Sequence, residues 1–495
     1  MDAARQRLAP VRRLAACAAV ALLAGCGSSS APERGPTLRL TVPLVPRTLD
    51  PARVADLPSL NVAHELYAGL TRFSGRGVAP DLAESWDIGQ GGLVWTFHLR
   101  RNLRWSDDRP LTAQDFRRSW LRALDPRTGA ALAGPDLGIV KGARAYHETG
   151  RGAVGVQALD RQTLRVTLQH PVPWLDQLVA FPIAFPAPAH GSAFSGPFRV
   201  VLRRPARLVL ERNFNYWNAG VVKPSRIVLT RSEEQTDGVL PSGLAPPGLP
   251  WIDTAGPAPK GSTELPMLAT GLMWLVTQGT PLADQRKRQF VAWAVTHLKL
   301  GSAPASLVPH EMPGAPIVNS HKQVQLAGKL TPLHLTVAWA EQDLGASRVA
   351  ARLRRSAHQL GQFQISLSFR PVPTLGRLLE LAGPPARPGV DLVLLGWSSK
   401  IFDAYNLLDL FPCGSAFNVA HWCDPSYDAL MRRAVRTLNE QARWQIERSL
   451  VEKLHDAVPA TPIYTASDHV RLAPSVHGFA WSPIGFYELM GMTRS

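Results

Sequence analysis

The sequence predicts an α/β fold of two or three domains, built around a mostly parallel sheet. The chain has 495 residues, which is too many for a single hydrophobic core. At both ends of residues 333–369, apolar residues alternate with others, as in strands. Between these ends the apolar residues keep helical spacing. The run at 391–395 is continuously apolar, as in a strand buried on both faces. Strand–helix–strand order with short loops favours parallel pairing.

The first 25 residues are predicted to be a signal peptide rather than part of the fold. Four arginines precede a 12-residue apolar run, which is too short to span a bilayer comfortably. The run ends in Leu23-Ala24-Gly25-Cys26, which resembles the lipobox of bacterial lipoproteins. That resemblance implies cleavage before Cys26, a diacylglycerol on its sulfur, and a flexible lipidated tether over 26–36. The alternative is an ordinary secreted protein with a chance cysteine.

Residues 38–42 alternate and predict the first strand, and 59–69 are predicted to be a helix that ends at Gly69. Trp95, Phe97 and Leu99 then alternate with polar residues, as in a half-buried strand. The sequence of 107–110 indicates a turn. Thr112 stands where a helix N-cap belongs, and Asp115 follows three residues later as a variant of the capping box.

The block at 80–116 also resembles one family, the oligopeptide- and dipeptide-binding proteins of bacterial ABC importers (family 5 extracellular solute-binding proteins). The order and spacing of Leu82-Ala83-Glu84-Ser85-Trp86, the 95–100 segment and the 111–116 segment match the family. Asp108 departs from it by replacing the usual turn glycine, so a different turn type is expected there. Further matching segments at 195–200, 211–217, 284–296 and 424–430 extend the resemblance from Thr37 to Gly478.

The resemblance implies a periplasmic-binding-protein type II fold (cluster C), with two α/β lobes and an extra inserted domain. The expected boundaries are lobe I from 37–75 with 190–262 and 468–495, the inserted domain at 76–189, and lobe II at 263–467. Lobe I is thus expected to be discontinuous and to include the C-terminal tail.

Family members bind an extended peptide between the lobes, and an acid three residues after a Gly-Trp pair meets its ammonium end. Here Gly396-Trp397-Ser398-Ser399-Lys400 places a lysine at the acid's position. Trp397, Ser398, Lys400 and Asp403 are therefore the expected ligand-binding residues. Three alternatives stay open: Asp403 takes over the ammonium, an anionic ligand group meets Lys400, or Lys400 faces solvent and the ligand is neutral. Trp397 is equally consistent with core packing.

Four cysteines are present, and two of them, Cys413 and Cys423, remain after Cys17 leaves with the signal and Cys26 takes the lipid. An exported protein meets an oxidising compartment, so these two are predicted to form a disulfide. They make a poor zinc site because His421 is the only nearby histidine. No metal and no cofactor are expected.

The net charge of +16 invites a nucleic-acid interpretation, yet the arginines are scattered and no nucleic-acid-binding motif is found. The expected function is therefore an exported solute-binding lipoprotein, a monomer anchored on the outer face of the cytoplasmic membrane. It would capture peptides or a related small solute by hinge closure and deliver them to an ABC permease. A receptor or scaffold without transport is the alternative. A hydrolase is less favoured because Gly-x-Ser-x-Gly, Ser-x-x-Lys and His-Glu-x-x-His are absent.

Overall fold

A computed structural model describes residues 35–231, 236–241, 250–251, 260–298, 307–309, 312, 331–382, 389–415 and 417–495. The predicted signal peptide, Cys26 and nearly all of the predicted tether lie outside these ranges. Among the described helices, none combines the length and the apolar character that a membrane span requires.

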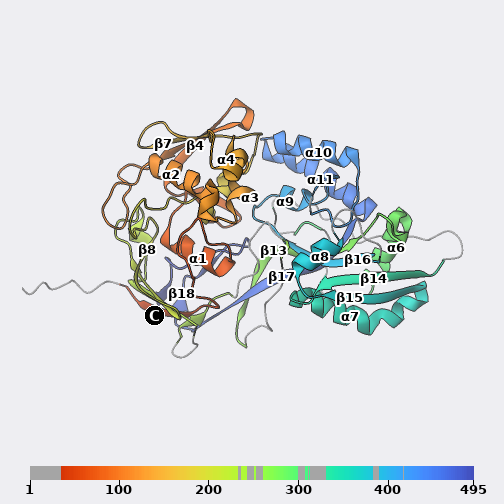
Figure 1. Cartoon of the computed structure of the whole chain (residues 1–495). Helices are drawn as coiled ribbons and strands as arrows, with labels where there is room; N and C mark the ends of the chain where they lie inside the picture. The colour runs from red at the N-terminus through yellow and green to blue at the C-terminus, as the bar shows by residue number, and fades with distance from the viewer. Residues whose placement is uncertain are drawn as a thin grey trace, which may run out of the picture.

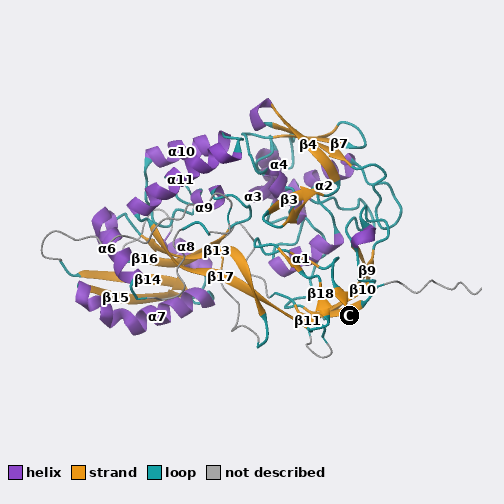
Figure 2. Ribbon diagram, turned by 180° about the vertical axis from the view of Figure 1, so that it is seen from behind, coloured by secondary structure: helices purple, strands orange, loops and turns teal. Residues whose placement is uncertain are grey.

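A large sheet runs through the molecule from one end to the other (Figures 1 and 2). Its strands lie in the order β15 (Ile365–Val372), β14 (Leu333–Ala340), β16 (Leu392–Ser398), β13 (Thr263–Leu275), β17 (Ala460–Leu472), β11 (Gly238–Val239), β1 (Thr37–Thr41), β10 (Arg226–Thr230), β9 (Arg207–Arg212) and β8 (Phe198–Arg204). The short strand β12 (Pro250–Trp251) pairs with β16.

The sheet is mixed, so the prediction of a mostly parallel sheet is wrong. Parallel pairing joins β14 to β15 and β16, and β1 to β10 and β11. The predicted strand–helix–strand run is present there, with α7 (Leu344–Leu360) and α8 (Leu375–Ala382) between the strands. Elsewhere the pairing is antiparallel, because β8 and β9 form a hairpin and β13 and β17 cross the molecule in opposite directions.

The strands β13 and β17 connect the two ends of the sheet. The last seven residues of β13 pair with β16, whereas the end of β17 pairs with β11, which lies beside β1. Their mutual register shifts between Pro266 and Thr270 and again between Gly271 and Leu272. The long strands are therefore irregular where they pass from one half of the molecule to the other.

A second, four-stranded antiparallel sheet lies apart from the first, in the order β4 (Ala83–Gly89), β5 (Val94–Leu99), β7 (Thr163–Thr167) and β6 (Val156–Ala158). Trp95, Phe97 and Leu99 are buried, which confirms the predicted half-buried strand. The helix α2 (Ala113–Leu124) packs on β6 and β7 and begins with the predicted capping box of Thr112 and Asp115. Asp108 has a φ of 69°, so it adopts the left-handed conformation for which glycine is usual.

The helix α1 (Leu57–Leu66) begins at the N-cap Asp56 and stops three residues before the predicted end at Gly69. The glycine has another role. A Cβ atom at Gly69 would lie 2.4 Å from a ring carbon of Phe185 and 2.7 Å from the carbonyl oxygen of Thr71. Gly69 therefore permits close packing after the helix and does not terminate it.

The C-terminal tail packs against α1. Asn61 Oδ1 accepts a hydrogen bond from the backbone N–H of Tyr487, and Glu65 Oε1 accepts one from Leu489. The tail forms two short ladders, β18 (Val476–His477) with β21 (Thr493–Arg494) and β19 (Ala480–Trp481) with β20 (Tyr487–Glu488). The remaining elements are the hairpin β2 (Thr71–Ser74) and β3 (Gly77–Pro80) and the helices α3 (Ala133–Leu137), α4 (Ala143–Thr149), α5 (Leu175–Leu178), α6 (Gln285–Thr296), α9 (Tyr405–Leu408), α10 (Pro425–Arg436) and α11 (Glu440–Ala457).

Candidate ligand-binding site

The strand β16 carries Trp397 and Ser398 at its C-terminal end, and both side chains are buried. The Trp397 ring packs edge to face on Phe417, with 5.1 Å between the ring centroids. The register places Trp397 opposite Thr270 of β13, so the two side chains leave the sheet on the same face. Trp397 Nε1 and Thr270 Oγ1 are both buried without a hydrogen-bond partner in the described part of the chain. Such groups are costly to leave unpaired.

Lys400 follows β16 and forms an ion pair with Asp136 of α3, with 2.8 Å between Nζ and Oδ1. The two side chains are 18% and 13% exposed, so the pair is partly shielded from water. Asn406 Oδ1 accepts hydrogen bonds from the Lys400 backbone N–H at 2.9 Å and from the Ser399 hydroxyl at 3.1 Å. The loop that carries Lys400 is thereby fixed by its own side chains.

The same loop has two further contacts with the segment around α5. The backbone N–H of Phe402 donates to Gln177 Oε1 at 2.6 Å. The rings of Tyr405 and Trp174 lie 4.5 Å apart between centroids. With the Lys400 ion pair, these contacts join residues 400–405 to the region predicted as the inserted domain. Figure 1 shows α9 beside α3 and α4 at this junction.

Two carboxyl groups at this junction, of the half-buried Asp176 and the exposed Asp409, have raised pKa values. Burial raises the pKa of Asp176 to about 6. Burial also raises the pKa of Asp409 to about 6, although a hydrogen bond from Tyr405 and the charge of Lys400 act in the opposite direction. The raised pKa of Asp176 is the better supported of the two, because its side chain is less accessible to water than that of Asp409.

Asp403 lies in a buried ionic group. Its Oδ2 accepts from the Arg443 guanidinium at 2.8 Å, and its Oδ1 accepts from the backbone N–H of Tyr405 at 3.0 Å. Glu447, one helical turn from Arg443 on α11, completes the group. Burial and the neighbouring Asp403 raise the pKa of Glu447 well above its usual range, so its carboxyl is protonated at neutral pH.

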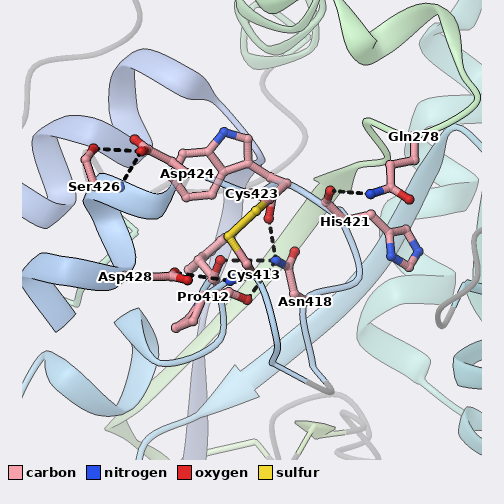
Figure 3. The surroundings of a disulfide bond; sticks show 11 residues. Gln278, Pro412, Cys413, Asn418, His421, Cys423, Asp424, Ser426 and Asp428 are labelled. Carbon is pink, nitrogen blue, oxygen red and sulfur yellow. Dashed lines mark hydrogen bonds between the residues drawn. A yellow bond between two sulfur atoms is a disulfide. The ribbon is translucent and has the colours of Figure 1, made fainter. Parts of the chain in front are cut away.

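The predicted disulfide between Cys413 and Cys423 is present, with 4.5 Å between the Cα atoms (Figure 3). Inside the loop that it closes, Asn418 Nδ2 donates to the carbonyl oxygens of Phe411, Pro412 and Trp422. The loop also carries Phe417, the residue that packs on Trp397. The disulfide thus fixes the backbone that holds one side of the Trp397 environment.

The structure brings Trp397, Ser398 and Lys400 together at the end of β16 and places Asp403 in the buried ionic group behind them. Sequence reasoning named these four residues but missed Asp136, Gln177 and Arg443. An i, i+4 spacing of Arg443 and Glu447 is visible in the sequence, whereas Asp136 lies 264 residues from Lys400 and carries no local signal. Within the described residues, no group of three or more His, Cys, Asp or Glu side chains could hold a metal ion.

The sequence is similar to a family model and to several proteins that are named for binding solutes outside the cytoplasm. The sequence model of "Bacterial extracellular solute-binding proteins, family 5 Middle" matches residues 77–296. The probable deoxycholate-binding periplasmic protein YgiS of Escherichia coli (strain K12) is 27% identical over 485 residues, covering 88% of this chain and 89% of that protein. The periplasmic oligopeptide-binding protein OppA of the same strain is 26% identical over 495 residues, covering 88% of each.

The fold is similar to a solved structure described as the MppA periplasmic murein tripeptide binding protein in its unliganded open form. The TM-score is 0.77 at 20% sequence identity, and the match covers 92% of this chain and 97% of that one. This confirms the predicted periplasmic-binding-protein fold with two lobes and an extra domain. These proteins are named for binding and not for catalysis. Together these similarities support a solute-binding protein of family 5, the class to which the model matching residues 77–296 refers.

Proposed function

We propose that the protein is an extracytoplasmic receptor that captures a peptide or a related small solute and delivers it to an ABC permease. The observation that carries the proposal is the junction at the end of β16, where Lys400, three residues after the buried Trp397, pairs with Asp136 of the region predicted as the inserted domain. The corresponding Gly-Trp segment holds the ligand in the family that this chain resembles. Relatives named for oligopeptide and murein peptide binding support the peptide class.

The charges at this junction bear on how a ligand is held. Lys400 is already paired with Asp136, and Asp403 is already paired with Arg443. A peptide ammonium would therefore have to compete with Lys400 for Asp136, or with Arg443 for Asp403. An anionic ligand group would instead compete with Asp136 for Lys400. We propose that an anionic group of the ligand meets Lys400, because Lys400 is partly exposed whereas Asp403 and Arg443 are almost fully buried.

The relative named as probably binding deoxycholate makes an amphipathic anion a second candidate ligand. The specific observation in its favour is again the cation at position 400. In either case Trp397 Nε1, which has no partner among the described residues, is proposed as a hydrogen-bond donor for the ligand, and Thr270 Oγ1 can donate or accept.

Hinge closure is the proposed mechanism, with β13 and β17 as the connection between lobes that follow the predicted boundaries. An open and a closed form interconvert, and a ligand that contacts both lobes shifts the population toward the closed form. No chemical step takes place on the chain. We further propose that the protein is a monomer held by a lipid on Cys26 at the outer face of the cytoplasmic membrane.

Native mass spectrometry of the protein purified from its host tests the ligand class directly. The expected result is a co-purified peptide, and calorimetry then compares that peptide with its N-acetylated and C-amidated forms. If Lys400 meets an anion, amidation weakens binding more than acetylation does. Co-purified bile-acid-like anions would replace the peptide proposal by the second candidate. Uptake into vesicles that contain the permease separates transport from a receptor role without transport.

A further inference from the structure

A pocket outside the junction described above lies at one end of the sheet. It has a volume of about 590 Å³ and opens at the tip of the β8–β9 hairpin, next to the residues that follow β1 and β10. Its lining residues are Leu44, Val45, Pro46, Arg47, Arg203, Arg204, Pro205 and Arg231. The volume lies within the range of sites for small organic molecules.

Four arginines line this pocket, and no acidic residue lines it among the described residues. In the described part of the chain, none of the four guanidinium groups has a carboxylate partner. The other end of the same hairpin is different, because Arg199 and Arg226 both pair with Glu211. Among the described residues, carboxylates therefore pair with the arginines at one end of the hairpin and with none of those at the other.

The guanidinium group of Arg203 is also held in position. Its Nη2 donates to the backbone carbonyl oxygens of Pro46 and Arg47, which ties the hairpin tip to the loop after β1. Like charges this close repel one another, and a bound anion removes that cost. Guanidinium groups bind phosphate oxygens in bidentate geometry, which makes arginine the usual residue for such anions.

The position of the pocket in the fold agrees with a ligand site. β1 and β10 run parallel, and the pocket residues 44–47 and Arg231 follow their C-terminal ends. Open α/β sheets bind ligands beyond the carboxyl ends of their parallel strands. The apolar part of the lining can take the organic portion of a ligand.

From these observations we propose that the arginine pocket binds a phosphate-bearing anion, either a soluble organic phosphate or the headgroup of an anionic phospholipid. The proposal does not depend on the ligand at the end of β16. It concerns different residues, so the failure of either proposal leaves the other intact.

The test uses the exported protein with Cys26→Ser, so that no acyl chain can bind membranes. Calorimetry measures inorganic pyrophosphate binding, and flotation measures binding to phosphatidylglycerol vesicles against phosphatidylcholine vesicles. The variant is Arg204→Gln with Arg231→Gln, and Arg47→Gln is a second variant. Arg199→Gln is the matched control, because it removes the same charge from the same hairpin outside the pocket.

We expect binding by the wild type that is weakened at least about tenfold in the double variant and changed less than about twofold in Arg199→Gln. Loss confined to pyrophosphate assigns a soluble phosphate, and loss confined to phosphatidylglycerol vesicles assigns a lipid headgroup. The proposal is overturned if the wild type binds neither probe, or if Arg199→Gln weakens binding as much as the pocket variants do. Circular dichroism verifies that each variant is folded.

Discussion

Lys400 and Asp136 form an ion pair of 2.8 Å between residues 264 positions apart in the chain. The lysine stands where the family resemblance of the sequence predicts an acid, and its partner comes from the region predicted as the inserted domain. The substitution at position 400 is therefore accompanied by a specific partner across the molecule.

Replacing Asp136 by Asn is expected to lower the free energy of unfolding by about 1–2 kcal/mol, between the values for exposed and buried pairs, because it leaves the Lys400 charge without its partner. Chemical denaturation without ligand measures the change. Glu380→Gln is the control, since it breaks an exposed pair with Arg377 inside one helix and should cost less than about 0.5 kcal/mol. Equal effects of the two variants would contradict a special role for the Asp136 pair.

Replacing Lys400 by Asp is expected to reverse the charge preference at this position: C-amidated peptides with a free N-terminus should gain affinity by about tenfold or more, because the carboxylates at positions 136 and 400 would then attract an ammonium in place of a carboxylate. N-acetylated peptides should show no such gain. Lys400→Met separates loss of the cation from gain of the anion, and calorimetry measures all three proteins. A gain that acetylation does not abolish would leave the electrostatic argument without support.

Glu447 predicts a pH dependence of stability. Its pKa is raised in the folded state, so the native protein keeps a proton that the unfolded chain releases above its usual pKa of 4.5. The contribution of this group to stability is therefore full below pH 4.5 and is lost as the pH rises toward the raised pKa. One fully retained proton corresponds to about 1.4 kcal/mol per pH unit.

Replacing Glu447 by Gln removes that proton equilibrium, so stability measured between pH 5 and 8 should fall less steeply than in the wild type. Glu452→Gln, on the exposed side of the same helix, should follow the wild-type slope. Identical slopes for all three proteins would show that Glu447 does not hold a proton in the folded state.

Replacing Cys413 and Cys423 by Ser should lower the free energy of unfolding by about 2–3 kcal/mol, as expected for a short disulfide loop. Ligand affinity should also fall, because the loop carries Phe417, which packs on Trp397. Thermal unfolding with and without dithiothreitol measures the first effect, and the double variant should be insensitive to the reductant. Unchanged affinity would show that the disulfide does not support the ligand-binding residues.

Local patterns in the sequence predicted local structure well. The capping box at Thr112 and the strand with Trp95 depend on residues close together in the chain, and both were confirmed. The end of α1 was predicted wrongly because the role of Gly69 is set by Phe185, which is distant in sequence. Strand direction was partly wrong for the same reason, since the pairing of β13 with β17 has no local signature.

The same distinction between local and distant contacts applies to the candidate site. The Gly-Trp segment could be recognised in the sequence as a motif. The disulfide could be predicted from the number of cysteines that remain in the exported chain. The partners of Lys400 and Asp403 were not, because ion pairs between distant segments depend on how the chain packs.

The passage of β13 and β17 through the whole sheet limits how the protein can move. A pair of hydrogen-bonded strands resists sliding and separation, yet it flexes where its ladder is interrupted, as it is between Pro266 and Leu272. In the proposed closure, the two strands would restrict the movement to a rocking of one half against the other about a single line, and a substitution other than at Thr270 that restored a regular ladder there would stiffen the protein.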